Sequence, residues 1–104
     1  MFNVGDKFKV RTIQPVCIYT ESYNSQSYCY DLDLNKELSI QNITDDYCLD
    51  VVENDDVISV YIPKGMPCNV ICQGIRKYSI IFKNIQCELE IDDITFDEIF
   101  SLDD

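Results

Sequence analysis

The side chains that could do chemistry in this 104-residue chain are cysteines and carboxylates, because histidine is absent. Without imidazole, a cysteine nucleophile lacks its usual general base, and catalytic triads and zincin sites are excluded. The carboxylate pairs Asp31/Asp33 and Asp92/Asp93 could serve in acid–base catalysis or hold a metal ion. A chain of this length with few long loops, however, leaves little room for the cleft that such a pair must flank. We therefore expect a protein that is not an enzyme and that uses no metal ion or cofactor.

Thiol chemistry depends on the compartment. The six cysteines are Cys17, Cys29, Cys48, Cys68, Cys72 and Cys87. The first residues lack the basic and apolar regions of a signal peptide, which predicts a cytoplasmic protein with six reduced thiols. A disulfide framework in a secreted protein is one alternative. Structural zinc is another, but Cys68 and Cys72 form the one close pair, whereas zinc ribbons and fingers usually use two.

The elements that must position these groups are strands, because apolar and polar residues alternate along most of the chain. In residues 7–13 the cations Lys7, Lys9 and Arg11 alternate with Phe8 and Val10. Similar alternation or β-branched runs cover residues 16–20, 28–34, 37–41, 57–62, 69–73, 77–83 and 85–92. Turn residues separate them at 23–27, 35–36 and 63–67. The pattern predicts one mainly β domain over residues 1–104, a small antiparallel barrel or sandwich with one or two short helices.

Two segments carry helix signals. Residues 44–53 can form a short helix with Thr44 as N-cap, or a strand through Tyr47, Leu49 and Val51. The two acids after Thr44 favour the helix, since they suit a helix N-terminus and are depleted in strands. Residues 95–100 predict a single helical turn, because Thr95 is followed by Glu98 at capping-box spacing.

The N-terminal residues Phe2 to Val10 read FNVGDKFKV. This stretch resembles the first turn and strand of small Src-homology-type and ribosomal KOW-type barrels, which often have Val-Gly-Asp before a strand. The resemblance covers about nine residues and implies a small barrel. This resemblance assigns no functional role to any residue of the chain.

Charge is segregated along the chain. With 19 acidic and 8 basic residues, the formal net charge is −11. Residues 45–56 hold six acids and no base, residues 84–104 hold eight acids and no base, and residues 64–83 hold four bases and no acid. Such runs are either a solvated face or a docking surface for a basic partner. An acidic surface repels nucleic acid, so we do not expect the protein to bind nucleic acid directly. No apolar run approaches the ~20 residues that span a bilayer, so we do not expect a membrane partner either.

The docking interpretation places the site in the C-terminal acidic segment. The predicted partner-binding residues are Glu88, Glu90, Asp92, Asp93, Phe96, Asp97 and Glu98. Phe96 is the candidate anchor, because interfaces favour aromatic residues inside a polar rim. The alternative is that Phe96 and Phe100, four residues apart, close the open end of the fold.

In size, acidity and absence of catalytic groups, the chain resembles phage-encoded inhibitors of host defence such as anti-CRISPR proteins. That resemblance implies an inhibitor in the host cytoplasm that masks the basic surface of a nucleic-acid-binding effector. Two alternatives stay open: a structural or assembly protein of a virion or larger complex, and a thiol- or zinc-dependent regulator. The oligomeric state is also open.

Overall fold

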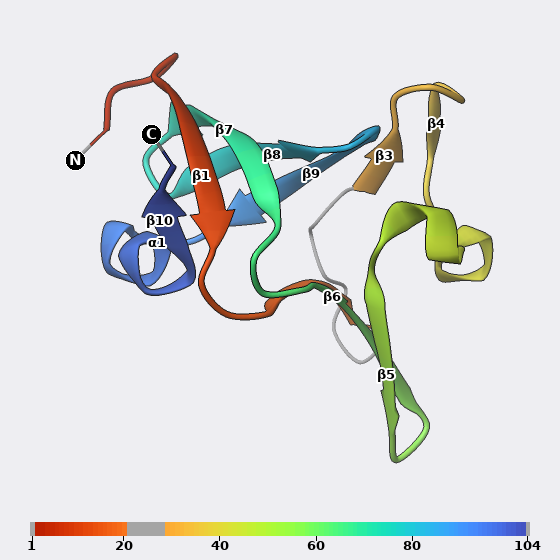
Figure 1. Cartoon of the computed structure of the whole chain (residues 1–104). Coiled ribbons are helices and arrows are strands. Elements are labelled where there is room, and N and C mark those ends of the chain that lie inside the picture. Colours follow the sequence, from red (N-terminus) through yellow and green to blue (C-terminus); the bar gives the residue numbers. More distant parts are fainter. Residues whose placement is uncertain (1, 21–28, 104) are drawn as a thin grey trace.

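The computed structural model describes residues 2–20 and 29–103, and these form a mainly β, antiparallel fold (Figure 1). The strands are β1 (Lys7–Thr12), β2 (Val16–Thr20), β3 (Cys29–Asp31), β4 (Lys36–Glu37), β5 (Asp50–Asn54), β6 (Val57–Ile62), β7 (Pro67–Gly74), β8 (Lys77–Phe82), β9 (Ile85–Glu90) and β10 (Phe100–Leu102). The helical elements are two 3₁₀ turns, η1 (Ile40–Asn42) and η2 (Asp45–Tyr47), and one α-helix, α1 (Asp93–Ile99).

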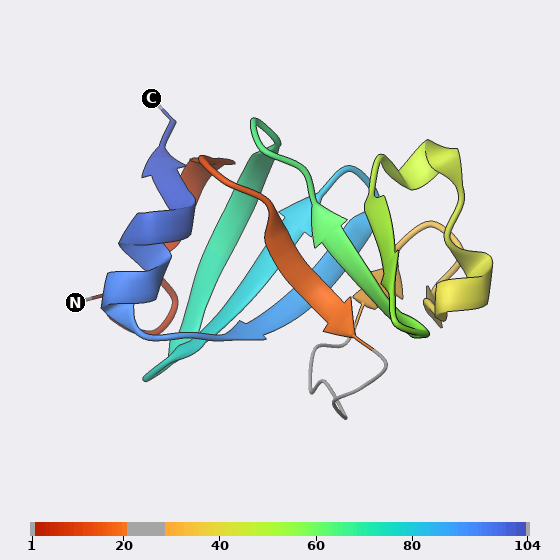
Figure 2. The same cartoon turned by 90° about the horizontal axis from the view of Figure 1, so that it is seen from below.

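The strands form two sheets. Seven strands pair in the order β10-β1-β7-β8-β9-β3-β4, and three pair in the order β2-β6-β5. Figure 2 shows α1 at one end and the η1–η2 segment at the other. In the described part of the chain no pairing joins β10 to β4, so the larger sheet stays open. The prediction of a mainly β antiparallel fold is therefore confirmed as a sandwich-like arrangement, without a closed barrel.

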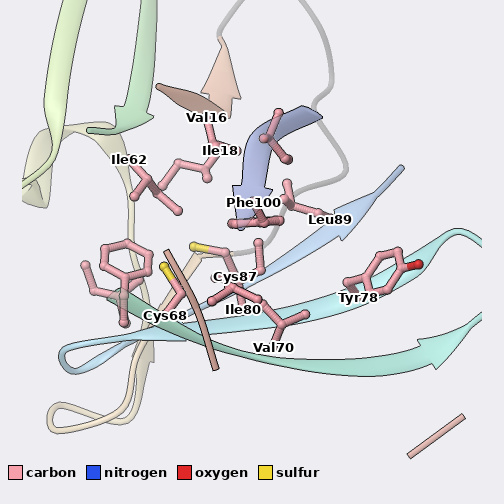
Figure 3. Packing of buried hydrophobic residues seen from close by; sticks show 14 of the residues in the cluster. Val16, Ile18, Ile62, Cys68, Val70, Tyr78, Ile80, Cys87, Leu89 and Phe100 are labelled. Carbon is pink, nitrogen blue, oxygen red and sulfur yellow. The ribbon is translucent and has the colours of Figure 1, made fainter. Parts of the chain in front are cut away.

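The core lies between the two sheets, because alternate side chains of each strand point to the same side. On β9, Ile85, Cys87 and Leu89 are buried, as the alternation predicts. Figure 3 shows Val16, Ile18 and Ile62 of the smaller sheet facing Cys68, Ile80 and Cys87 of the larger one. The chain thus buries one face of each sheet.

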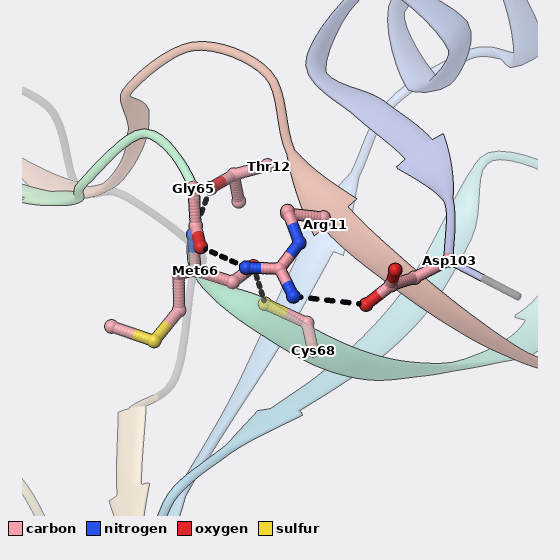
Figure 4. Close-up of polar contacts among 6 residues, drawn as sticks. All are labelled: Arg11, Thr12, Gly65, Met66, Cys68 and Asp103. Atoms are coloured by element: carbon pink, nitrogen blue, oxygen red, sulfur yellow. Dashed lines mark hydrogen bonds and ion pairs between the residues drawn. The ribbon is translucent and has the colours of Figure 1, made fainter.

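Two adjacent connections carry the chain between the sheets, at residues 13–15 and 63–66. Thr12 holds them together although its side chain is buried. Its hydroxyl donates to the Pro63 carbonyl at 2.7 Å. The same hydroxyl accepts a hydrogen bond from the Met66 amide at 2.8 Å (Figure 4). Both hydrogen-bonding capacities of this buried hydroxyl are therefore used, and the Pro-rich turn is fixed against β1.

Arg11 ties the same turn to the C-terminal strand. Its guanidinium donates to the Gly65 carbonyl at 2.8 Å and forms an ion pair with Asp103 at 3.2 Å (Figure 4). Gly65 has φ +88°, a conformation that favours glycine because it has no Cβ. The Asp103 amide also donates to the Lys9 carbonyl, which continues the β1–β10 pairing.

The middle of the chain departs from the predicted pattern. The predicted strand at 28–34 ends at Asp31, and Leu32 and Leu34 are 42% and 59% exposed in the turn that follows. The predicted strand at 37–41 is limited to β4 and is followed by η1. Alternation there was misleading because a turn after Asp31, held by hydrogen bonds from the Asp33 and Leu34 amides to the Asp31 carboxylate, reverses the chain into β4. The expected hairpin tip at 23–27 lies outside the described residues.

The helix favoured for residues 44–53 is wrong for most of its length. The segment begins with η2 and then becomes β5, which pairs with β6 from Asp50 opposite Tyr61 to Asn54 opposite Val57. Cys48 has φ +55°, which ends the 3₁₀ turn and redirects the chain. The two acids therefore begin only a single 3₁₀ turn, and pairing with β6 determines the structure of the rest of the segment.

Candidate functional site

The helix α1 begins earlier than the predicted turn. Asp92, and not Thr95, is its N-cap: the Asp92 carboxylate accepts a hydrogen bond from the Thr95 amide at 2.7 Å. This bond lowers the pKa of Asp92, and the nearby positive charge of Arg76 adds to the effect. Asp92 therefore has a structural role in starting the helix.

Phe96 points into the protein. It is 2% exposed and packs against the rings of Phe2, Phe8, Tyr78 and Phe100, with ring centroids between 4.9 and 6.4 Å away. The expectation that Phe96 is an exposed anchor is therefore wrong, because the spacing of Phe96 and Ile99 places both on the buried side of α1. Phe100, the first residue of β10, is buried as well. Phe96 is a core residue.

The opposite face of α1, away from the buried Phe96 and Ile99, is exposed. Ile94 is 72% exposed, and Asp97 and Glu98 follow it at spacings of three and four residues. Ile75, in the β7–β8 turn, is 93% exposed. That turn is joined to the residue before the helix cap, since the Ile91 amide donates to the Arg76 carbonyl at 3.0 Å. We call Ile75, Ile94, Asp97 and Glu98 the α1 surface.

Asp93, another predicted partner-binding residue, is half-buried and bonds to a core residue. Its carboxylate accepts a hydrogen bond from the Tyr78 hydroxyl at 3.0 Å. Burial and this bond raise the pKa of Tyr78 to about 12. Asp93 thus supplies the partner that a buried tyrosine hydroxyl requires.

The shifted pKa of Tyr78 predicts a loss of stability in alkali. An unfolded tyrosine ionises near pH ~10, so the protonated phenol stabilises the fold below that pH, and this contribution disappears as the pH rises from 10 to 12. The free energy of unfolding of Tyr78→Phe, followed by urea titration between pH 9 and 12, should fall less steeply than that of the wild type. Tyr61→Phe, at a partly buried tyrosine of β6, is the matched control. Equal slopes for wild type and Tyr78→Phe would contradict the assignment.

No family model, no curated protein and no solved structure matches this chain. The described residues contain no group of three or more Cys, Asp or Glu side chains placed to hold a metal ion. Across the same residues, no helix is long and apolar enough to cross a membrane.

Glu88 and Glu90 lie in a different environment from the α1 surface. They line a groove of about 880 Å³ that runs between the two sheets. Glu37 and Lys77 are the other charged residues of the lining, and Cys17 and Cys29 contribute thiols. Its apolar lining includes Ile18, Leu38, Ile40, Ile43, Leu49 and Leu89. The volume and the mainly apolar lining are typical of binding grooves.

Asp31 and Asp33 do not form a catalytic pair. Asp31 is 1% exposed, and its carboxylate accepts hydrogen bonds from the Tyr47 hydroxyl at 2.6 Å and the Asn84 amide at 3.2 Å. It also accepts from the backbone amides of Asp33 and Leu34, both at 2.9 Å. These bonds, with that from Tyr47 the largest contribution, lower the pKa of Asp31. The carboxylate is a structural centre that joins β3, η2 and the β8–β9 turn.

The seven predicted residues are thus distributed over four environments. Asp97 and Glu98 are on the α1 surface, Glu88 and Glu90 line the groove, Asp92 and Asp93 hold the helix, and Phe96 is in the core. The structure adds Ile94 and Ile75, which the sequence analysis missed. The helical spacing of Ile94 with the two acids was the signal that could have identified Ile94; no local pattern indicates Ile75.

Proposed function

We propose that this protein is a binding module whose α1 surface docks against a basic surface of another protein. The observation that carries the proposal is that Ile94, 72% exposed, lies on the same face of α1 as the exposed Asp97 and Glu98. The β7–β8 turn, which is hydrogen-bonded to the residue before the helix cap, adds Ile75, 93% exposed. Exposed apolar residues beside charged ones suit an interface with an apolar centre and a polar rim.

Within the described residues, no ion pair neutralises the charges of this surface. Among residues 2–20 and 29–103, the single ion pair joins Arg11 to Asp103, so Asp97 and Glu98 have no cationic partner within 4 Å. A net charge of −11 exceeds the magnitude of about 2–8 that solubility requires in a small domain. The excess costs self-repulsion, which a cationic partner surface would relieve.

The partner that fits this chemistry is a protein whose basic surface otherwise holds nucleic acid. Carboxylates on the module compete with phosphates for the same Lys and Arg side chains, so docking would block nucleic-acid binding. This is the mode of action expected of a small acidic inhibitor encoded by a phage or mobile element.

Charge reversal of the exposed acids should weaken the complex by about tenfold or more. The test uses Asp97→Lys/Glu98→Lys, which spares Asp92 and Asp93 and places cations near a helix C-terminus, where they are tolerated. The partner is captured from host lysate with the wild-type chain and identified by mass spectrometry. Binding of the purified partner is then measured by surface plasmon resonance at low and high salt. Association should slow as salt rises, since the Debye length is only ~8 Å at physiological ionic strength.

The matched control is Asp50→Lys/Glu53→Lys, which makes the same change in net charge on β5. Both residues are exposed, and β5 and α1 lie at opposite sides of the molecule (Figures 1 and 2). This control should bind nearly as the wild type does. Loss of binding in the β5 variant with none in the α1 variant would move the site to β5. Unchanged binding in both would mean that the acids are only solvated.

A further inference from the structure

Cys29 and Cys87 lie directly opposite each other on neighbouring antiparallel strands, β3 and β9. The Leu38 amide donates to the Cys29 carbonyl at 2.8 Å, so the backbone carbonyl of Cys29 bonds on the β4 side of β3 and not on the β9 side. The Leu32 amide bonds to the Asn84 carbonyl, three pairs further along β3 and β9. Since hydrogen-bonded pairs alternate along an antiparallel ladder, Cys29 and Cys87 form a non-hydrogen-bonded pair. In such pairs the Cα atoms are ~4.5 Å apart, within the range of about 4.4–6.8 Å that a disulfide spans.

The two thiols are already in contact. Their sulfur atoms are 3.1 Å apart, and the Cys87 thiol donates a hydrogen bond to the Cys29 sulfur. That bond lowers the pKa of Cys29, whereas the pKa of Cys87 is raised by the same bond and by burial. Cys29 therefore has the greater thiolate character of the two, and the thiolate is the reactive form.

The two cysteines differ in how accessible they are to a solute. Cys29 is half-buried and is one of the residues that line the groove between the sheets, so a small solute can approach it from the groove. Cys87 is 0% exposed and is reached through Cys29. Cys68 and Cys72 are also buried, and burial raises the pKa of Cys68 to about 12. Cys17 and Cys48 are exposed, and in the described structure their sulfur atoms bond to the Tyr19 carbonyl and the Lys83 amine and not to a second thiol.

We propose that Cys29 and Cys87 are a redox-active dithiol that a hydroperoxide converts into a cross-strand disulfide. The Cys29 thiolate attacks the terminal peroxide oxygen: an S–O bond forms, the O–O bond breaks, and the alkoxide leaves as an alcohol (water from hydrogen peroxide) with the proton from Cys29. The Cys87 sulfur then attacks the Cys29 sulfenic acid: the S–S bond forms, the S–O bond breaks, and water leaves with the proton from Cys87. Two thiols and one hydroperoxide thus give one disulfide, one alcohol and one water. This reaction is independent of the proposed interface at α1.

The experiment treats the folded, fully reduced protein with one equivalent of hydrogen peroxide and removes the excess with catalase. Remaining thiols are alkylated in denaturant, and tryptic peptides are analysed by mass spectrometry. We expect a mass loss of two hydrogens, four alkylated cysteines and a cross-link between peptides 12–36 and 84–104. Peptide 12–36 also contains Cys17, so the same digest is made on Cys17→Ser. The cross-link should persist in Cys17→Ser and disappear in Cys29→Ser, whose side chain is close in size to that of cysteine.

The result that would overturn the proposal is six alkylated cysteines after oxidation of the wild type. A cross-link that disappears in Cys17→Ser, or that joins Cys17 or Cys48 between two chains, would equally contradict it. So would oxidation of Cys29 to its sulfinic acid with Cys87 still alkylated. Circular dichroism of Cys29→Ser must match that of the wild type. If Cys29→Ser does not fold, the wild-type and Cys17→Ser digests decide the question by themselves.

Discussion

Replacing Phe96 by alanine is expected to lower the free energy of unfolding by about 3–5 kcal/mol, the usual cost of truncating a buried phenylalanine. The ring is 2% exposed and packs against four other aromatic rings, so its removal leaves a cavity and takes away those contacts. Because domains of this size are stable by about 5–15 kcal/mol, the loss is a large part of the total. Urea denaturation followed by far-UV circular dichroism measures it.

Ile94→Ala on the same helix is the matched control. Its side chain is 72% exposed, and the structure predicts a change in stability of about 0.5 kcal/mol or less. The two variants therefore separate stability from binding: Phe96→Ala should unfold early, and Ile94→Ala should stay folded but bind the partner more weakly. A stable Phe96→Ala with impaired binding would restore Phe96 as a surface anchor.

Asp31→Ala should also be severely destabilising, with a melting temperature lower by on the order of 10 °C. The substitution leaves the Tyr47 hydroxyl, the Asn84 amide and the two backbone amides without their shared acceptor. Buried donors without partners cost more than the bond itself was worth. Thermal unfolding followed by circular dichroism tests this, with Asp33→Ala, at an exposed neighbour, as the control. Similar melting temperatures for the two variants would contradict the structural role of Asp31.

The same carboxylate makes the fold sensitive to acid. Its pKa is lower in the folded chain than the unfolded value of about 3.9, so its contribution is complete above that pH and is lost as the pH falls toward the folded pKa. Asp31→Asn keeps a hydrogen-bonding side chain but cannot titrate. Between pH 5 and 2 its free energy of unfolding should therefore fall less than that of the wild type. Parallel curves would show that Asp31 is not the group responsible.

Local sequence was sufficient to predict the strands that lie in the sandwich. In β1, β2 and β6 to β9, alternation of apolar and polar residues marks the buried side of each strand, because a strand buried on one face has a period of two. The Pro-rich turn at 63–67 and the mainly β class follow from equally local signals. The sequence by itself also shows that residues 45–56 and 84–104 are acidic stretches without a base.

What the tertiary structure decided is which distant residues meet. Asp31 receives hydrogen bonds from residues 16 and 53 positions away, and Cys29 contacts a thiol 58 positions away. Strand alternation assigns a side chain to a face but leaves open which strands become neighbours, so neither contact could be predicted. Phe96 shows the same limit at short range: its charged neighbours suggested an exposed anchor, and packing of α1 against four rings buried it and left Ile94 outside. Burial depends on the packing partner, which is a property of the whole fold.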